Sequence, residues 1–300
     1  PKSVFDMLDR LCAIYVKFNC FDIALDYGKL ELDAAEKSGD CSLSAIAYRT
    51  RSKLFYLNDM IECRHSLDKV DEMLHLIPSY RIQLNNNIYR AIVDLTYNDK
   101  NCYDEIIDSV EEMTNTAFEQ KLNRADIQSN MVLAAAYIKR GSFEDLKTAR
   151  QKTVRAINYS IRFGIPSYMW QLYNLLAVID TKLKADSNKI KQSFEMAFDT
   201  LNRQNLLYVG RGDLCYSNLL AISNIGFFLR RNSYQKTFNS RMSMLTYCDN
   251  NTEKGTNRGI SGTELTEIYE KAMGKKLLFS TVDSSRLLRD DETGYFLALT

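Results

Sequence analysis

The sequence predicts an all-α protein built from pairs of antiparallel helices. Its 300 residues include only 3 prolines and 12 glycines, the two residue types that most readily interrupt a helix. Apolar residues recur three and four positions apart, which places them on one face of a helix. Asn or Gly recurs where one helix must reverse into the next, about 40 residues apart at the first four turns.

The first pair is predicted around Asn19, in the stretch AIYVKFNCFDIALDYGKL. Before this turn, Leu8, Leu11, Cys12 and Tyr15 form an apolar stripe on one helix. The stripe of the following helix consists of Phe21, Ala24, Leu25, Gly28, Leu32 and Ala35. Neither stripe can be buried by its own helix. We therefore expect the two helices to pack against each other and then against a neighbouring pair.

The same pattern recurs at Asn58, Asn101, Gly141 and Asn232, each flanked by an aromatic or large apolar residue on both sides. A sixth and less regular pair is expected between residues 167 and 205, with its turn near 186–188. Together these segments predict about six antiparallel helix pairs over residues 1–249. A period of this kind is typical of a helical solenoid.

The pattern changes after residue 249. Residues 250–262 form a polar linker with glycines, and a short helix follows from residue 263 to Gly274. Three short apolar segments then predict a small β-meander over about 275–299, and the last two flank a hairpin-length loop at 290–294. Three strands alone are marginal in water. They would either cap the array or expose an edge to a partner, with Phe279, Tyr295 and Phe296 as candidate contact residues.

Composition narrows the functional classes. A net charge of +1 argues against a nucleic-acid-binding protein, and no apolar run approaches the roughly 20 residues of a membrane span. Seven cysteines without a C-x-x-C pattern are typical of reduced core thiols, which indicates a cytoplasmic protein. Because the chain begins without Met inside helical pattern, we expect it to be the C-terminal part of a larger protein.

No catalytic motif is recognisable. The two histidines, His65 and His75, would lie about 15 Å apart on one helix, too far to share a metal ion. No phosphate-binding loop, nucleophile elbow or paired His/Cys arrangement is present in the sequence. We therefore expect a binding module and not an enzyme, with no cofactor in this region.

The pair around Asn19 resembles a tetratricopeptide repeat (TPR). Its family positions are occupied by Leu8, Leu11, Cys12, Tyr15, Asn19, Phe21 and Ala24, and later by Tyr137, Gly141 and Phe143. The units are longer than the family's usual length of about 34 residues, and Glu36 stands where the late proline is expected. The resemblance implies a degenerate, TPR-like right-handed superhelix with a concave groove.

In such an array the first helix of each pair lines the groove. This implies that the groove residues are Ser52, Tyr56, Asn98, Lys139 and Arg230. A second candidate surface is basic, because Lys147, Arg155 and Arg162 share a helix face opposite the acidic segment 104–112. That face either steers a charged partner or is an ordinary solvated helix surface.

These features predict a protein-binding scaffold. Degenerate TPR-like arrays are similar to the C-terminal sensor regions of bacterial STAND NTPases, including antiviral ones. This similarity implies recognition of a folded foreign protein, such as a phage structural or packaging protein, and oligomerisation through N-terminal domains. The alternative is the peptide-binding domain of a bacterial signalling regulator. A helical-toroid enzyme or an RNA-binding repeat is disfavoured, because no convergent acids or histidines, constant period or basic groove are present.

Overall fold

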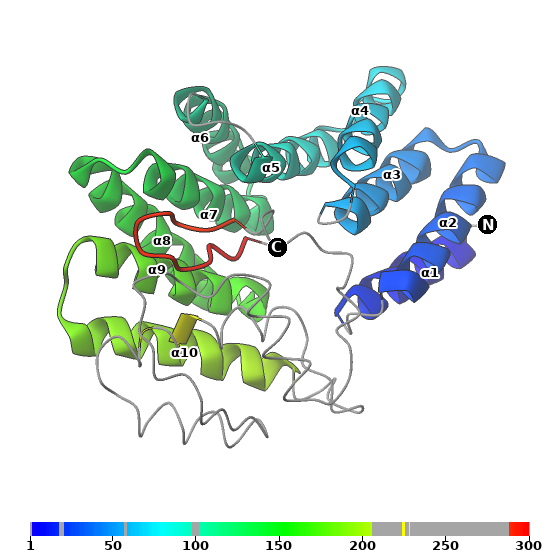
Figure 1. Ribbon diagram of the computed structural model, residues 1–300. Helices are drawn as coiled ribbons and strands as arrows, with labels where there is room; N and C mark the ends of the chain where they lie inside the picture. The colour runs from blue at the N-terminus through cyan, green and yellow to red at the C-terminus, as the bar shows by residue number, and fades with distance from the viewer. Residues whose placement is uncertain are drawn as a thin grey trace. The chain divides into compact units, whose positions relative to one another are not determined.

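A computed structural model describes residues 2–17, 21–56, 59–97, 102–205, 224, 225, 228 and 288–299 (Figure 1). Within these residues the chain forms ten α-helices and one short 3₁₀ helix, so the all-α class is confirmed. Neighbouring helices pack against each other from α1 to α4 and from α6 to α10, which is compatible with a helical-repeat solenoid. The chain divides into two compact units, Pro1–Asp94 and a second unit that begins at Leu95 and includes residues 288–299.

The first unit contains α1 (Lys2–Lys17), α2 (Phe21–Ser38), α3 (Cys41–Phe55), α4 (Met60–Leu76) and most of α5 (Tyr80–Tyr97). Helix α1 packs against α2, α2 against α3, and α3 against α4, which confirms the first two predicted pairs. One apolar cluster joins Cys12, Ala24 and Leu54, and a second forms around Phe5 and Ala35. Both predicted stripes thus contribute to packing between helices, with Cys12, Ala24 and Ala35 fully buried.

Close approach of α2 and α3 depends on Gly28. A Cβ atom at this position would lie 2.7 Å from Cδ1 of Leu54, closer than any van der Waals contact allows. The glycine lets the two helices meet at this point, which is why a residue with poor helix propensity stands inside α2.

The second unit contains the end of α5, then α6 (Tyr103–Glu119), α7 (Asn123–Arg140), α8 (Phe143–Arg162), the 3₁₀ helix η1 (Pro166–Tyr168), α9 (Met169–Lys182) and α10 (Ser187–Asn205). Helix α7 packs against α6, α8 and α9, and α9 packs against α8 and α10. The predicted pairs at Gly141 and at 167–205 are confirmed. Since α7 has neighbours on several sides, nearly every residue from 125 to 138 is buried.

The reversal from α7 to α8 uses the predicted glycine. Gly141 ends α7 with a left-handed φ of 83°, and its N–H donates to the carbonyl oxygen of Tyr137. Ser142 and Asp145 then form a capping box at the start of α8. The sixth turn lies at 183–186, slightly before the expected position, with Lys184 at a φ of 54°. The other predicted turn residues, Asn19, Asn58, Asn101 and Asn232, lie outside the described residues.

The predicted β-meander is not found in the described residues. Residues 288–299, called the C-terminal hairpin below, contain no strand and only one antiparallel bridge, between Arg289 and Phe296. The chain does reverse at 290–294, as expected, through a hydrogen bond from Gly294 N–H to the carbonyl oxygen of Asp290. The predicted linker, the short helix and the first strand lie outside the described residues.

Candidate functional site

Helix α9 carries buried polar side chains in an otherwise apolar sequence. Trp170, Leu172, Leu175 and Val178 are buried, as expected for a helix packed between α8 and α10. Asn174, in the middle of this helix, is only 1 % exposed. A buried amide needs hydrogen-bond partners within the protein. The partners of Asn174 define a buried polar site in the described part of the chain.

Asn174 and Asn224 bind the main chain of Phe296 in the C-terminal hairpin. The Asn174 Nδ2 donates to the carbonyl oxygen of Phe296 at 2.8 Å. The Asn224 Nδ2 donates to the same oxygen at 2.9 Å, and its Oδ1 accepts from the Phe296 N–H at 2.9 Å. Asn224 Nδ2 also donates to Asn174 Oδ1 at 2.6 Å. Asn224 therefore contacts an extended chain as a neighbouring β-strand would, through both donor and acceptor.

An ion-pair cluster holds the turn of the hairpin. Lys182 at the end of α9 lies 2.8 Å from Asp290 Oδ1 and 2.9 Å from Glu292 Oε2. Both Lys182 and Asp290 are almost fully buried, whereas Glu292 is exposed. Burial alone would lower the pKa of Lys182, but the hydrogen bonds and charges of Asp290 and Glu292 raise it above its usual value. Lys139 of α7 adds a longer contact of 3.6 Å to Asp291.

Asp290 also shapes the turn itself. Its Oδ2 accepts from the N–H of Thr293 at 2.8 Å and from the Thr293 hydroxyl at 2.6 Å. One carboxylate thus satisfies both the turn and Lys182. The acidic loop that the sequence marks as a hairpin connection is in fact anchored to a helix.

Aromatic packing completes the contact. The ring of Tyr295 lies 4.9 Å from the ring of Phe194 in α10, and Phe194 lies 5.5 Å from Phe228. The residues after the turn, from Tyr295 to Leu299, are all buried. Figure 1 shows the hairpin in red against the helices of the second unit. We call its main helix-side contacts the hairpin seat, comprising Lys139, Asn174, Lys182, Phe194, Asn224 and Phe228.

Three of the predicted contact residues meet at this place. Lys139 belongs to the seat, and Tyr295 and Phe296 belong to the hairpin that occupies it. The sequence left open whether Tyr295 and Phe296 cap the array or expose an edge to a partner, and their exposed fractions of 1 % and 3 % favour the cap. They are buried against the seat of their own chain.

The groove positions predicted in the first unit also need correction. Ser52 is fully buried and its hydroxyl donates to the carbonyl oxygen of Arg49, one turn earlier in α3. Tyr56 is 6 % exposed and packs at a tilt against Tyr89 of α5. Both side chains contribute to the packing of the first unit and present no surface to a partner. Asn98, Arg230 and Phe279 lie outside the described residues.

The basic face of α8 is largely neutralised within the chain. Lys147 pairs with Glu144 at 2.7 Å and lies over the ring of Phe143. Arg155 lies 3.5 Å from the buried carboxylate of Asp126 and stacks over Phe118 and Tyr159. This arrangement favours the structural interpretation over a partner-steering patch.

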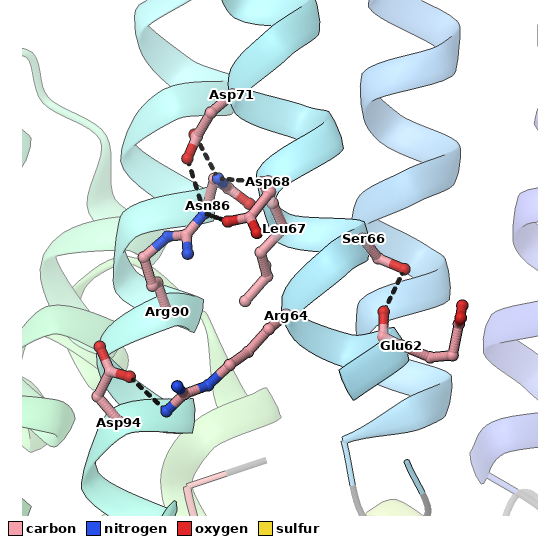
Figure 2. Close-up of polar contacts among 9 residues, drawn as sticks. All are labelled: Glu62, Arg64, Ser66, Leu67, Asp68, Asp71, Asn86, Arg90 and Asp94. Carbon is pink, nitrogen blue, oxygen red and sulfur yellow. Dashed lines mark hydrogen bonds and ion pairs between the residues drawn. The ribbon is translucent and has the colours of Figure 1, made fainter. Parts of the chain in front are cut away.

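A separate polar cluster joins α4 to α5 in the first unit (Figure 2). Arg90 of α5 bridges Asp68 and Asp71 of α4, at 2.9 and 2.7 Å. The Nδ2 of the buried Asn86 donates to Asp71 at 2.7 Å and to the carbonyl oxygen of Leu67 at 3.3 Å. The two acids are three residues apart on α4, and Asn86 and Arg90 are four residues apart on α5, so each pair lies on one helix face. The contacts between these faces hold the two helices together. The cluster positions helices and leaves no charge without an opposite charge nearby.

One buried acid in the first unit is not matched in this way. Glu31 of α2 is fully buried near Thr50, Arg49 and Lys53, but neither of its carboxylate oxygens accepts a hydrogen bond of normal geometry from the described residues. Burial, and then the negative charge of Asp9, raise the pKa of Glu31 to about 8. Burial likewise raises the pKa of Cys12 to about 12, which keeps this thiol protonated. Cys12 and Cys63 are free and buried, as the sequence predicts.

Metal binding and membrane insertion find no support in the described ranges. No group of three or more His, Cys, Asp or Glu side chains there has the arrangement of a metal site. No helix described is at once long enough and apolar enough to cross a membrane.

The sequence pattern missed Asn174, Lys182 and Asn224. A signal was present, because Asn174 interrupts the apolar run of MWQLYNLLAVID and Asn224 interrupts LLAISNIG. A polar residue at a predicted core position indicates a buried partner. Which residue that partner is cannot be derived from local spacing. The chain matches no protein-family model, and no curated protein is significantly similar to it in sequence.

Proposed function

We propose that the chain is a protein-binding module that holds an extended polypeptide segment across its helices. One observation carries this proposal, namely the hydrogen bonding of the Phe296 main chain by Asn174 and Asn224. Asn174 lies 122 residues before Phe296 in the sequence, and it binds Phe296 through a main-chain group that every polypeptide has. Neutral amides placed against a main chain suit binding better than acid-base or nucleophilic catalysis.

At a finer level we propose that the array is a TPR-like superhelix and acts as a sensor. The ordered packing of successive helices supports a repeat architecture, which offers extended binding surfaces. On the resemblance described above, the partner would be a phage structural or packaging protein, and the chain would be the target-sensing region of a bacterial STAND NTPase in the cytoplasm. Oligomerisation would then take place through N-terminal domains, without cofactor, nucleic acid or membrane binding by this region.

A binding comparison with a matched variant tests this function. The purified chain and an Asn174→Ala variant are incubated with lysates of phage-infected and uninfected bacteria, and bound proteins are identified by mass spectrometry. We expect a phage protein that is retained by the chain and reduced at least about tenfold by the variant, as loss of a buried hydrogen bond of about 1.4 kcal/mol implies. The purified candidate must then bind directly. Equal recovery on both proteins would contradict the proposal.

The second candidate function is that of a peptide-binding domain in a signalling regulator. The C-terminal hairpin favours it specifically, because the segment held by the seat is only 12 residues long and is bound at Phe296 through its main chain. The two functions differ in the size of the ligand. A partner that binds only as a folded domain supports the sensor, whereas binding of isolated short peptides from a bacterial culture supernatant supports the regulator.

A further inference from the structure

The C-terminal hairpin has the contacts of a bound ligand, although it belongs to the same chain. We propose that the hairpin seat is a recognition site for an extended segment of a protein partner, which binds in place of residues 288–299. This inference rests on the proposed function and specifies its ligand. The segment carries an acidic residue opposite Lys182, an aromatic residue opposite Phe194 and a free main-chain N–H opposite Asn224.

The main-chain contacts do not depend on the identity of the residue held. Asn224 accepts from the Phe296 N–H and donates to its carbonyl oxygen, and Asn174 donates to that oxygen as well. Any residue except proline offers this pair of groups. A segment from another protein can therefore replace Phe296 without loss of these three hydrogen bonds.

Lys182 selects the charge of the ligand. Its side chain is 5 % exposed when the seat is occupied, and its ammonium group is matched by Asp290 and Glu292. An occupant without an acid would leave a buried cation unpaired, which is strongly unfavourable. The neighbouring Lys139 also faces an acid, Asp291. The seat thus requires an acidic segment at this end.

Phe194 fixes the register of the ligand. It stacks on Tyr295 on one side and on Phe228 on the other. In the hairpin this aromatic residue follows the acid at Asp290 by five positions and directly precedes the residue bound through its main chain. The resulting pattern is an acid, a turn that permits a positive φ as at Gly294, and then an aromatic residue.

Hydrogen bonds within the hairpin hold its turn and its single bridge, whereas its buried ion pair and its aromatic contact are made to the seat. It contains a single bridge, and short hairpins are marginal in water. Because it is tethered, it competes at an effective concentration of roughly millimolar. A partner segment must overcome this competition, so the hairpin raises the affinity threshold for binding.

The test weakens the hairpin in the full chain and supplies the same sequence as a separate peptide. Phe296→Pro removes the N–H that Asn224 accepts. A fluorescent peptide with the sequence of residues 288–299, LRDDETGYFLAL, is titrated into wild-type and F296P chains, and anisotropy reports binding. We expect the F296P chain to bind at least about tenfold more tightly, because its own hairpin no longer competes.

Two matched controls separate specific binding from adhesion. A peptide methylated at the nitrogen of Phe296 loses one hydrogen-bond donor and should bind the F296P chain about tenfold more weakly. In the F296P background, Lys182→Glu should abolish binding of the original peptide. A peptide with Glu292→Lys should recover part of the binding to that variant, because it restores an opposite charge.

Three outcomes overturn the inference. If the F296P chain keeps its helical circular dichroism and does not bind the peptide, the hairpin is a permanent cap. If F296P unfolds, a second chain with Asp290→Asn and Glu292→Gln is tested in its place. Unfolding of this second chain as well would show that the hairpin is a part of the folded core. If the F296P chain binds wild-type hairpins only as a mixed dimer, the occupant is a second copy. Peptide binding without any protein partner would defeat the proposed function alone, and partner binding without peptide binding would defeat this inference alone.

Discussion

At the scale of single residues, buried polar groups differ in how well they are matched. Asn174, Asn224 and Lys182 are buried, and each has hydrogen-bond or ion-pair partners within the second unit. Glu31 is buried without a hydrogen bond to either oxygen. Since matched buried groups fix a geometry and unmatched ones destabilise it, the two sets should respond oppositely to substitution.

We expect Asn174→Ala to lower the free energy of unfolding of the second unit by about 1–3 kcal/mol, because it leaves the carbonyl oxygen of Phe296 with one donor fewer. The only tryptophan, Trp170, lies one helical turn earlier in α9 and reports the transition by fluorescence in urea. Asn158→Ala, at an exposed position of α8, is the matched control and should change stability little. Equal effects of the two substitutions would contradict the role given to Asn174.

We expect Glu31→Gln to stabilise the first unit at neutral and higher pH. The carboxyl has a pKa of about 8 in the folded chain, against 4.5 for an ordinary glutamate. Between these values the folded chain holds a proton that the unfolded chain has lost, so stability falls as pH rises through this window. The negative charge of Asp9 raises this pKa further, whereas the positive charges of Arg49 and Lys53 lower it. Burial has a larger effect on the pKa than any of these charges.

The measurement is urea unfolding of both proteins from pH 5 to pH 9, followed by circular dichroism. The difference in unfolding free energy should grow with pH and reach about 1–3 kcal/mol above pH 8. Glu36→Gln, at an exposed position of the same helix, is the control. A difference that shrinks with rising pH would show that Glu31 is ionised and stabilising.

At the scale of elements, the helices fall into those with one buried face and those buried on several sides. Helices α1 and α2 have apolar stripes, and local spacing predicted them well. Helix α7 is buried nearly throughout, and its position follows from neighbours on both sides in sequence. Helices α2 and α3 approach each other closely at Gly28, because this residue has no side chain.

We expect Gly28→Ala to destabilise the first unit by about 1–3 kcal/mol in spite of the better helix propensity of alanine. The new methyl group would lie 2.7 Å from Leu54 Cδ1. Leu54→Val shortens the side chain at the same contact. The loss of unfolding free energy in the double variant should therefore be smaller than the sum of the losses in the two single variants. Thermal unfolding of the four proteins measures this coupling, and strict additivity would show that the contact is not responsible.

Local pattern was enough for the helices and insufficient for the site. The turn at Gly141 could be predicted because a left-handed helix end depends on the residue itself. The sequence could not decide whether Tyr295 and Phe296 are exposed or covered, because alternating apolar residues do not show whether their own chain buries them. Asn174 finds its partner 122 residues away, a relation that no local period contains.

At the scale of the whole molecule, the chain consists of two units that each have a core of their own. The first is held by apolar clusters among α1 to α3 and by the Arg90 cluster between α4 and α5. The second is held by α7 and α9 together with the C-terminal hairpin. Occupation of the hairpin seat should therefore change the stability of the second unit before that of the first.

Hydrogen exchange of the full chain tests this expectation. In solenoid-like arrays stability is the sum of repeat and nearest-neighbour contributions, so opening propagates mainly to adjacent helices. Lys182→Glu breaks two ion pairs with the hairpin, and should speed amide exchange at least about tenfold in α9 and α10. Exchange in α1 to α3 should stay within about twofold of the wild type. Lys189→Glu, at an exposed position of α10, controls for the change of charge. Equal acceleration in all helices would mean that the chain opens as one cooperative body, and that release of the hairpin is felt throughout the molecule.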